Sequence, residues 1–171
     1  AHERPPALDS PVIDPCHQQT TMARFCDCVD PGTGTPYERD PRSIAKSALN
    51  FVKSSGIGDT VFFGPEAEFF IFDDVKWSVL PNNTGYSYDA SELPGNSAKE
   101  YPEGNMGHRP GPKGGYFPVN PVDSAQDLRG EMLAVMGELG VRPEKHHHEV
   151  APAQHALGLQ VDTIVVIAYR L

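Results

Sequence analysis

Most of the 17 prolines and 16 glycines in this 171-residue chain fall in two stretches, residues 1–41 and residues 81–121. Proline lacks a backbone donor and glycine loses much entropy on ordering, so such stretches are expected to form turns and loops. We predict an extended arm over residues 1–20 and a long loop over residues 81–121. A loop of that length inside a domain is usually functional.

Two segments outside these stretches carry the signals of helices. Residues 41–55 follow the capping residue Asp40 and end before Gly56, and residues 124–139 end before Gly140. Asp123 and Asp127 are explained as helix-start residues. The apolar positions expected to face the core are Ile44, Ala48, Phe51 and Val52 in the first helix, and Leu128, Met132, Val135, Met136 and Leu139 in the second.

The remaining segments favour strands. Residues 22–29 and 141–150 have strand patterns, and residues 61–72 are short, apolar and aromatic-rich, with a bend expected at Gly64-Pro65. Residues 157–171 permit either a strand or a helix. The mixture predicts an α+β fold.

The charge of the chain excludes some classes of function. There are 14 Lys and Arg against 23 Asp and Glu, a formal net charge of −9, which argues against a general nucleic-acid binder. Apolar runs such as Ile164–Ala168 are much shorter than the roughly 20 residues of a membrane helix, and no export signal is visible. Three cysteines are too few for a disulfide framework, which favours a reducing environment. Together with the charge and the short apolar runs, this leads us to expect a cytoplasmic protein without membrane or nucleic-acid partners.

Glu66 and Glu68 form the first candidate site. They lie two residues apart in an expected strand, so both carboxylates point to the same face. Two carboxylates a few ångströms apart repel by about 4 kcal/mol at an effective dielectric of about 20. The pair therefore needs a cation, a shared proton or open water, and a solvated acidic face is the alternative to a binding site.

Residues 144–149 form the second candidate site. In a strand, Lys145, His147 and Glu149 share one face, and Glu144, His146 and His148 share the other, so the three histidines cannot all point into one metal site. Glu149 is a candidate ligand of a hard cation, with the histidines as substrate or supporting groups, and a hydrated surface patch is the alternative. Several carboxylate ligands suit Mg²⁺ or Mn²⁺ better than zinc.

Two further motifs are less specific. Residues 104–118 combine glycines with His108, Arg109 and Lys113, which suits a loop that binds an anion or a partner. Cys16-His17 and Cys26-x-Cys28 do not make the two matched pairs of a structural zinc site, so we interpret them as ordinary thiols.

Several strings resemble one enzyme family. Gly64–Phe70, Gly104–Pro110, Tyr116–Val119, Pro121–Asp127 and His146–Ala151 closely resemble bacterial type I glutamine synthetase, in the same order, over roughly residues 20–163. The resemblance implies part of an α+β catalytic domain, with antiparallel strands and flanking helices. It also implies ATP-dependent amidation of glutamate by ammonia through γ-glutamyl phosphate, for nitrogen assimilation, in a homo-oligomeric (dodecameric) full-length enzyme.

The resemblance also assigns residues. It implies that Glu66, Glu68 and Glu149 bind Mg²⁺ or Mn²⁺, and that Glu144 and Tyr116 lie at the ATP, and it assigns no catalytic residue. Metal ions would clamp phosphate oxygens and neutralise the charge that develops in phosphoryl transfer.

The chain also departs from the family. Residues 1–20 fit poorly, residues 21–171 correspond to the amino-terminal portion of the catalytic domain, and Ala156 stands where the family has a metal-binding Glu. Hydrophobic residues are 39% of the chain, which fits a missing part of the core. We expect an internal fragment that is inactive by itself. The alternatives are a non-catalytic metal-binding remnant and a ligase that joins glutamate to another amine.

Overall fold

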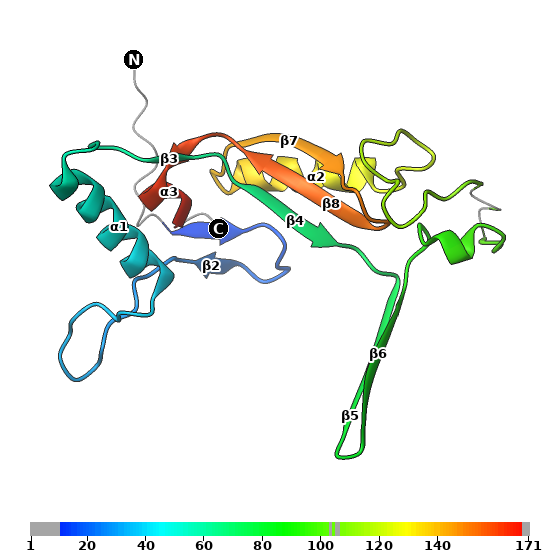
Figure 1. Ribbon diagram of the computed structural model, residues 1–171, viewed down its shortest axis with the longest axis horizontal. Coiled ribbons are helices and arrows are strands. Elements are labelled where there is room, and N and C mark those ends of the chain that lie inside the picture. Colours follow the sequence, from blue (N-terminus) through cyan, green and yellow to red (C-terminus); the bar gives the residue numbers. More distant parts are fainter. Residues whose placement is uncertain (1–10, 103, 105–106, 169–171) are drawn as a thin grey trace. The chain divides into compact units, whose positions relative to one another are not determined.

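The computed structural model describes residues 11–102, 104 and 107–168 (Figure 1). The chain divides into two compact units. One comprises Ala1–Pro65, Val135–Pro143 and Leu159–Leu171, and the other comprises Glu66–Ala134 and Glu144–Gly158. The site residues proposed from the sequence all lie in the second unit.

The first unit is built around helix α1 (Pro41–Ser55), as predicted. The Asp40 carboxylate accepts a hydrogen bond from the Ser43 N–H at 3.0 Å, and Gly56 ends the helix with φ 73°. Helix α3 (Ile164–Ala168) packs against α1. Strand β3 (Phe62–Phe63) pairs antiparallel with β9 (Asp162–Thr163), so the ambiguous tail contains both a strand and a helix.

The predicted buried face of α1 is wrong. Ile44 is 56% exposed and Phe51 70% exposed, whereas the buried side chain is that of Ala45. Over the described residues, the partner helix α3 is five residues long, and this part of it covers a narrow strip of α1.

The amino-terminal part of the first unit has more structure than expected. Strand β1 (Val12–Asp14) lies in the region predicted to be an arm, and it pairs antiparallel with β2 (Thr21–Ala23). Residues 1–10 of that predicted arm lie outside the described residues. The strand expected over 22–29 is shorter than predicted, because it ends at Ala23.

The second unit holds a three-stranded sheet in the order β4-β8-β7, formed by β4 (Glu66–Phe70), β8 (Gln154–Leu159) and β7 (Pro143–His148). Pro143, the first residue of β7, and Leu159, the last residue of β8, belong to the other unit. The predicted bend at Gly64-Pro65 separates β3 from β4, as expected.

Helix α2 (Gln126–Glu138) lies along one face of this sheet (Figure 1). It starts two residues later than predicted and ends before Gly140, whose φ is 77°. The predicted apolar stripe is only half-buried, and Leu128 is 47% exposed. The side chain that α2 buries completely is Arg129, because the sheet offers it polar partners.

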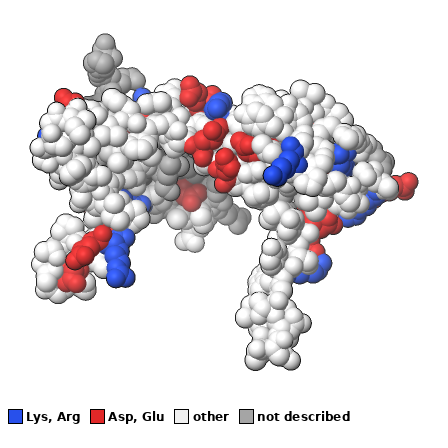
Figure 2. All heavy atoms as spheres, viewed as in Figure 1, with Lys and Arg blue, Asp and Glu red and all other residues white. Residues whose placement is uncertain are grey.

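The predicted loop over residues 81–121 is wrong at its start. Strand β5 (Asp74–Leu80) and strand β6 (Asn83–Asp89) form an antiparallel hairpin, with a two-residue turn between the paired residues Leu80 and Asn83. A short 3₁₀ helix, η1 (Pro94–Asn96), follows. The drawn face of this hairpin is almost free of charged atoms away from its base (Figure 2).

The strand pairs β1–β2, β3–β9, β4–β8 and β5–β6 are all antiparallel, so the predicted α+β class with antiparallel strands is confirmed. Within the described part of the chain, no helix has the length and apolar character needed to cross a membrane.

Candidate functional site

One face of the β4-β8-β7 sheet carries both candidate clusters. Glu66 and Glu68 project from β4 opposite Gly158 and Ala156 of β8, which confirms that the two carboxylates share a face. Lys145 and His147 reach the same face from β7, since both contact the Glu66 carboxylate. The two clusters, far apart in the sequence, therefore meet on one surface.

Glu66, His147 and Glu149 form a group that could hold a metal ion. His147 Nε2 lies 2.7 Å from Glu66 Oε1, and His147 Nδ1 lies 3.5 Å from Glu149 Oε1. One ligand atom from each residue lies within 4.8 Å of the others. His147 and Glu149 are buried, whereas Glu66 faces solvent. Among the described residues, these three side chains are the group of His, Cys, Asp or Glu residues close enough together to hold a metal ion.

The charge of Glu66 is stabilised in place. The hydrogen bond with His147, and then the one with Lys145, lower the pKa of the Glu66 carboxyl below its usual value. An ionised carboxylate next to an imidazole nitrogen is suitable for coordinating a divalent cation.

Glu68 lies on the same face but outside this group. Its Oε2 accepts a hydrogen bond from Gln154 Nε2 at 2.8 Å, and its cross-strand neighbour is Ala156, which is completely buried. The assignment of Glu68 as a metal ligand stays a prediction.

The loop before α2 brings Tyr116 to the edge of the group. The Gly115 N–H donates to the Val150 carbonyl at 3.0 Å, and a Cβ at this glycine would lie 3.0 Å from the Glu149 carbonyl oxygen. Glycine therefore allows the loop to lie against the chain after β7. The Tyr116 ring then packs edge-on against the His147 ring, with centroids 5.7 Å apart.

Glu144 is not brought into this group. It lies at the exposed start of β7, and strand alternation places it on the face opposite His147. The nucleotide roles of Glu144 and Tyr116 stay predictions.

Arg109, one of three cationic residues in the loop predicted to bind an anion or a partner (residues 104–118), is engaged within the protein. Arg109 is buried, and its guanidinium donates to the carbonyl oxygens of Ser91, Gly107 and His108. This side chain fixes the loop instead. Asn105 and Met106 of the same motif lie outside the described residues.

A buried carboxylate supports the end of β7 from the opposite face. Glu92 Oε2 lies 2.7 Å from His148 Nε2 and accepts from the Ala153 N–H at 2.8 Å, while Oε1 accepts from the Ser124 hydroxyl at 2.8 Å. Burial opposes ionisation of Glu92, but these hydrogen bonds hold its pKa at about 2. Ala153 has a φ of 63°, so Glu92 holds a strained connection between β7 and β8.

Arg129 of α2 contacts polar side chains on the sheet face opposite the metal group. Its guanidinium donates to both carboxylate oxygens of Asp123, at 2.8 and 2.5 Å, and to Nδ1 of His155 at 2.9 Å. His146 Nδ1 accepts from Arg129 Nε at 3.2 Å. The three adjacent histidines therefore have separate partners, as the strand alternation predicted: His147 contacts Glu66, His146 contacts Arg129 and His148 contacts Glu92.

The family profile described as "Glutamine synthetase, catalytic domain" matches residues 38–170. The chain belongs to this family. It is 60% identical over 160 residues to a glutamine synthetase of Bradyrhizobium diazoefficiens and 59% identical to one of Rhizobium meliloti, in each case over 94% of this chain and 34% of the relative. The chain thus spans about a third of the length of these relatives.

Other relatives extend this picture. A protein of Cupriavidus pinatubonensis named 3-hydroxylaminophenol mutase is 49% identical over 94% of the chain and 34% of its own length. Among solved structures, a Plasmodium falciparum glutamine synthetase matches with a TM-score of 0.70 and 26% identity, over 94% of this chain and 33% of that one.

The supporting layer of this glutamine synthetase domain was not found from the sequence. Glu92 stands alone in a Gly/Pro-rich stretch without any periodic pattern, so nothing marked it as buried. Asp123 was explained as a helix-start residue, and it does accept from the Ala125 N–H at 3.3 Å, but its main partner is Arg129.

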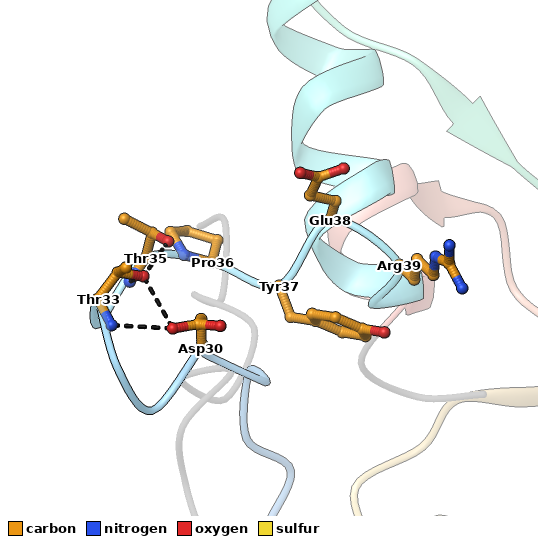
Figure 3. A pocket seen from close by; sticks show the side chains of 7 residues that line it. All are labelled: Asp30, Thr33, Thr35, Pro36, Tyr37, Glu38 and Arg39. Carbon is orange, nitrogen blue, oxygen red and sulfur yellow. Dashed lines mark hydrogen bonds between the residues drawn. The ribbon is translucent and has the colours of Figure 1, made fainter.

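The cysteines and one surface pocket lie apart from this site. All three cysteines are free and exposed, and the group that could hold a metal in the described residues contains none of them. A pocket of about 610 Å³ is lined by residues between Asp30 and Arg39 (Figure 3). Asp30 Oδ1 accepts from the N–H groups of Gly32 and Thr33, which confirms the predicted turn and explains the Asp30 carboxylate without a ligand.

We expect the folded chain to lose stability as the pH falls from 6.5 toward 4. Burial lowers the pKa of His155 from 6.5 to about 4, so over this range the unfolded state takes up a proton that the folded state does not. The expected loss is about 2 kcal/mol, measured from urea unfolding at a series of pH values. His155→Asn, which keeps an acceptor for Arg129 but does not titrate, is expected to flatten this dependence. An equal slope in both proteins would contradict the assignment.

Proposed function

We propose that the protein containing this chain is a glutamine synthetase, which amidates glutamate with ammonia and ATP through γ-glutamyl phosphate. The observation that carries the proposal is the meeting of Glu66, His147 and Glu149 on one sheet face, in a chain of this family. The high identity to bacterial glutamine synthetases over nearly the whole chain supports it. Residues 21–171 would form the amino-terminal portion of the catalytic domain.

The proposed metal ligands are Glu66, Glu68 and Glu149, with His147 as a nitrogen donor beside Glu66 and Glu149. The donor set fits a divalent cation, and an imidazole among carboxylates suits Mn²⁺ somewhat better than Mg²⁺, which prefers oxygen ligands. When bound, such an ion would neutralise charge on phosphate oxygens. The chain itself orients Glu66 through His147 and holds Glu149 through the Glu92-supported connection between β7 and β8.

The remaining assignments rest on the family. Glu144 and Tyr116 are proposed to lie at the ATP, and the aromatic contact of Tyr116 with His147 supports its place beside the metal group. The full-length enzyme is proposed to be a cytoplasmic dodecamer.

A second candidate is a metal-binding relative that does not ligate glutamate. Ala156 favours it, because this residue is completely buried opposite Glu68 and offers no ligand. A ligase that joins glutamate to another amine is the other alternative within the family.

The test is titration of Mn²⁺ into the purified chain, with free Mn²⁺ measured by its electron paramagnetic resonance signal. Glu149→Gln keeps an oxygen but removes the charge, so we expect binding to weaken about three- to tenfold. Glu144→Gln, at the exposed start of β7, should leave metal binding unchanged when no nucleotide is present. Equal affinities of the wild-type chain and Glu149→Gln would contradict the metal site.

A further inference from the structure

Lys145 reaches the same carboxylate oxygen as His147. Its Nζ lies 3.3 Å from Glu66 Oε1, the atom that His147 Nε2 approaches to 2.7 Å. An ammonium group and a divalent cation compete for the lone pairs of one oxygen, so a metal bound at this atom must displace the lysine.

The ion pair between Lys145 and Glu66 is weak enough for a metal ion to break. The side chains are 56% and 39% exposed, and an ion pair in that setting contributes little net stability because water screens it. Lysine is a flexible, strongly hydrated point charge, which can leave for solvent without leaving a buried group unpaired.

Gly158 leaves the space through which the Lys145 side chain reaches Glu66. Glu66 is on β4 and Lys145 is on β7, and β8 lies between these strands, with Gly158 directly opposite Glu66. A Cβ at Gly158 would lie 2.8 Å from Cγ and 3.0 Å from Cε of Lys145. The lysine stem therefore crosses β8 over the bare backbone of the glycine.

The backbone of Gly158 gives no other reason for a glycine. It is not among the described glycines with positive φ, so an ordinary residue could adopt its conformation. It also lies inside a strand, where glycine is a poor choice because it packs nothing and loses entropy. Room for the lysine is the reason that the structure offers.

We propose that Lys145 is a tethered cation that occupies the Glu66 side of the metal site until a divalent cation displaces it, and that Gly158 permits this by leaving its path across β8 open. Lys145 acts as a positioning residue: it holds the Glu66 carboxylate toward the site when no metal is bound, and it lowers the affinity for the metal. The inference deepens the proposed function and rests on it.

The test uses Mn²⁺ titration of the purified chain with five variants. Lys145→Met keeps most of the aliphatic stem and removes the competitor, so we expect Mn²⁺ to bind about two- to fivefold more tightly, the range of an exposed ion pair. Gly158→Ala keeps the charge but obstructs the path, and it should tighten binding in the same direction. The double variant should bind Mn²⁺ no more tightly than Lys145→Met does, because each of the two changes removes the same contact between Lys145 and Glu66.

Lys76→Met is the matched control. Lys76 also pairs with a carboxylate, that of Asp74, in an exposed ion pair on the β5–β6 hairpin, so its replacement changes the net charge equally. It should leave Mn²⁺ affinity unchanged.

Unchanged or weaker Mn²⁺ binding by Lys145→Met overturns the proposal, whatever the effect of Gly158→Ala on folding. Glu149→Gln separates this failure from a failure of the proposed function. If Glu149→Gln weakens binding and Lys145→Met has no effect, only the role of Lys145 is wrong. If Glu149→Gln has no effect, the metal site is wrong and the role of Lys145 falls with it.

Discussion

Replacing Arg129 by methionine is expected to destabilise the chain by about 3–5 kcal/mol, the cost of breaking a buried ion pair. Arg129 and Asp123 are 1% and 5% exposed at their side chains, so the change leaves the Asp123 carboxylate buried without its cation. Burial lowers the pKa of His146 and of His155, and the guanidinium lowers both further, so its loss also changes the surroundings of these two histidines. Urea unfolding followed by far-UV circular dichroism measures the effect.

Two variants control this measurement. Arg142, whose side chain is 52% exposed, pairs with Asp162 at 2.7 Å, so Arg142→Met removes the same groups from a more exposed arginine and should cost less than Arg129→Met. Adding Asp123→Asn to Arg129→Met should recover part of the lost stability, because the uncompensated charge is then absent. Similar losses for Arg129→Met and Arg142→Met would show that the buried network does not stabilise the fold.

Replacing Ala156 by glutamate is expected to tighten Mn²⁺ binding about ten- to thirtyfold. Position 156 is directly opposite Glu68 on the strand between β4 and β7, and strand alternation points it to the face that carries Glu66. A carboxylate about 4 Å from a charge gains about 4 kcal/mol per unit charge at an effective dielectric of about 20. If desolvation leaves a third to a half of that gain, the affinity rises about ten- to thirtyfold.

The same substitution has a cost in the absence of metal. Ala156 is completely buried, and a longer, charged side chain beside Glu68 adds crowding and repulsion, so Ala156→Glu should destabilise the metal-free chain by about 1–3 kcal/mol. Mn²⁺ should restore this stability, because binding to the folded state shifts the unfolding equilibrium. Ala156→Gln is the control of nearly equal volume. If it tightens Mn²⁺ binding as much as Ala156→Glu does, charge is not the cause.

Local signals in the sequence predicted the elements whose determinants lie within a few residues. Asp40 caps the start of α1 and Gly56 caps its end, Gly64-Pro65 separates β3 from β4, and Gly140 follows α2. These boundaries were predictable because caps and turns depend on the local backbone alone. The hairpin β5–β6 was missed, since both its faces are exposed and it lacks the alternation of a half-buried strand.

The sequence by itself determined the α+β class, the common face of Glu66 and Glu68, and the separation of the three histidines, since all of these follow from local periodicity. Only the tertiary structure decided which residues meet. Strand β8 lies between β4 and β7 and sets the register that brings His147 to Glu66, and α2 carries Arg129 to His155. Such pairings depend on residues distant in the chain, whose packing and buried charges no local pattern contains.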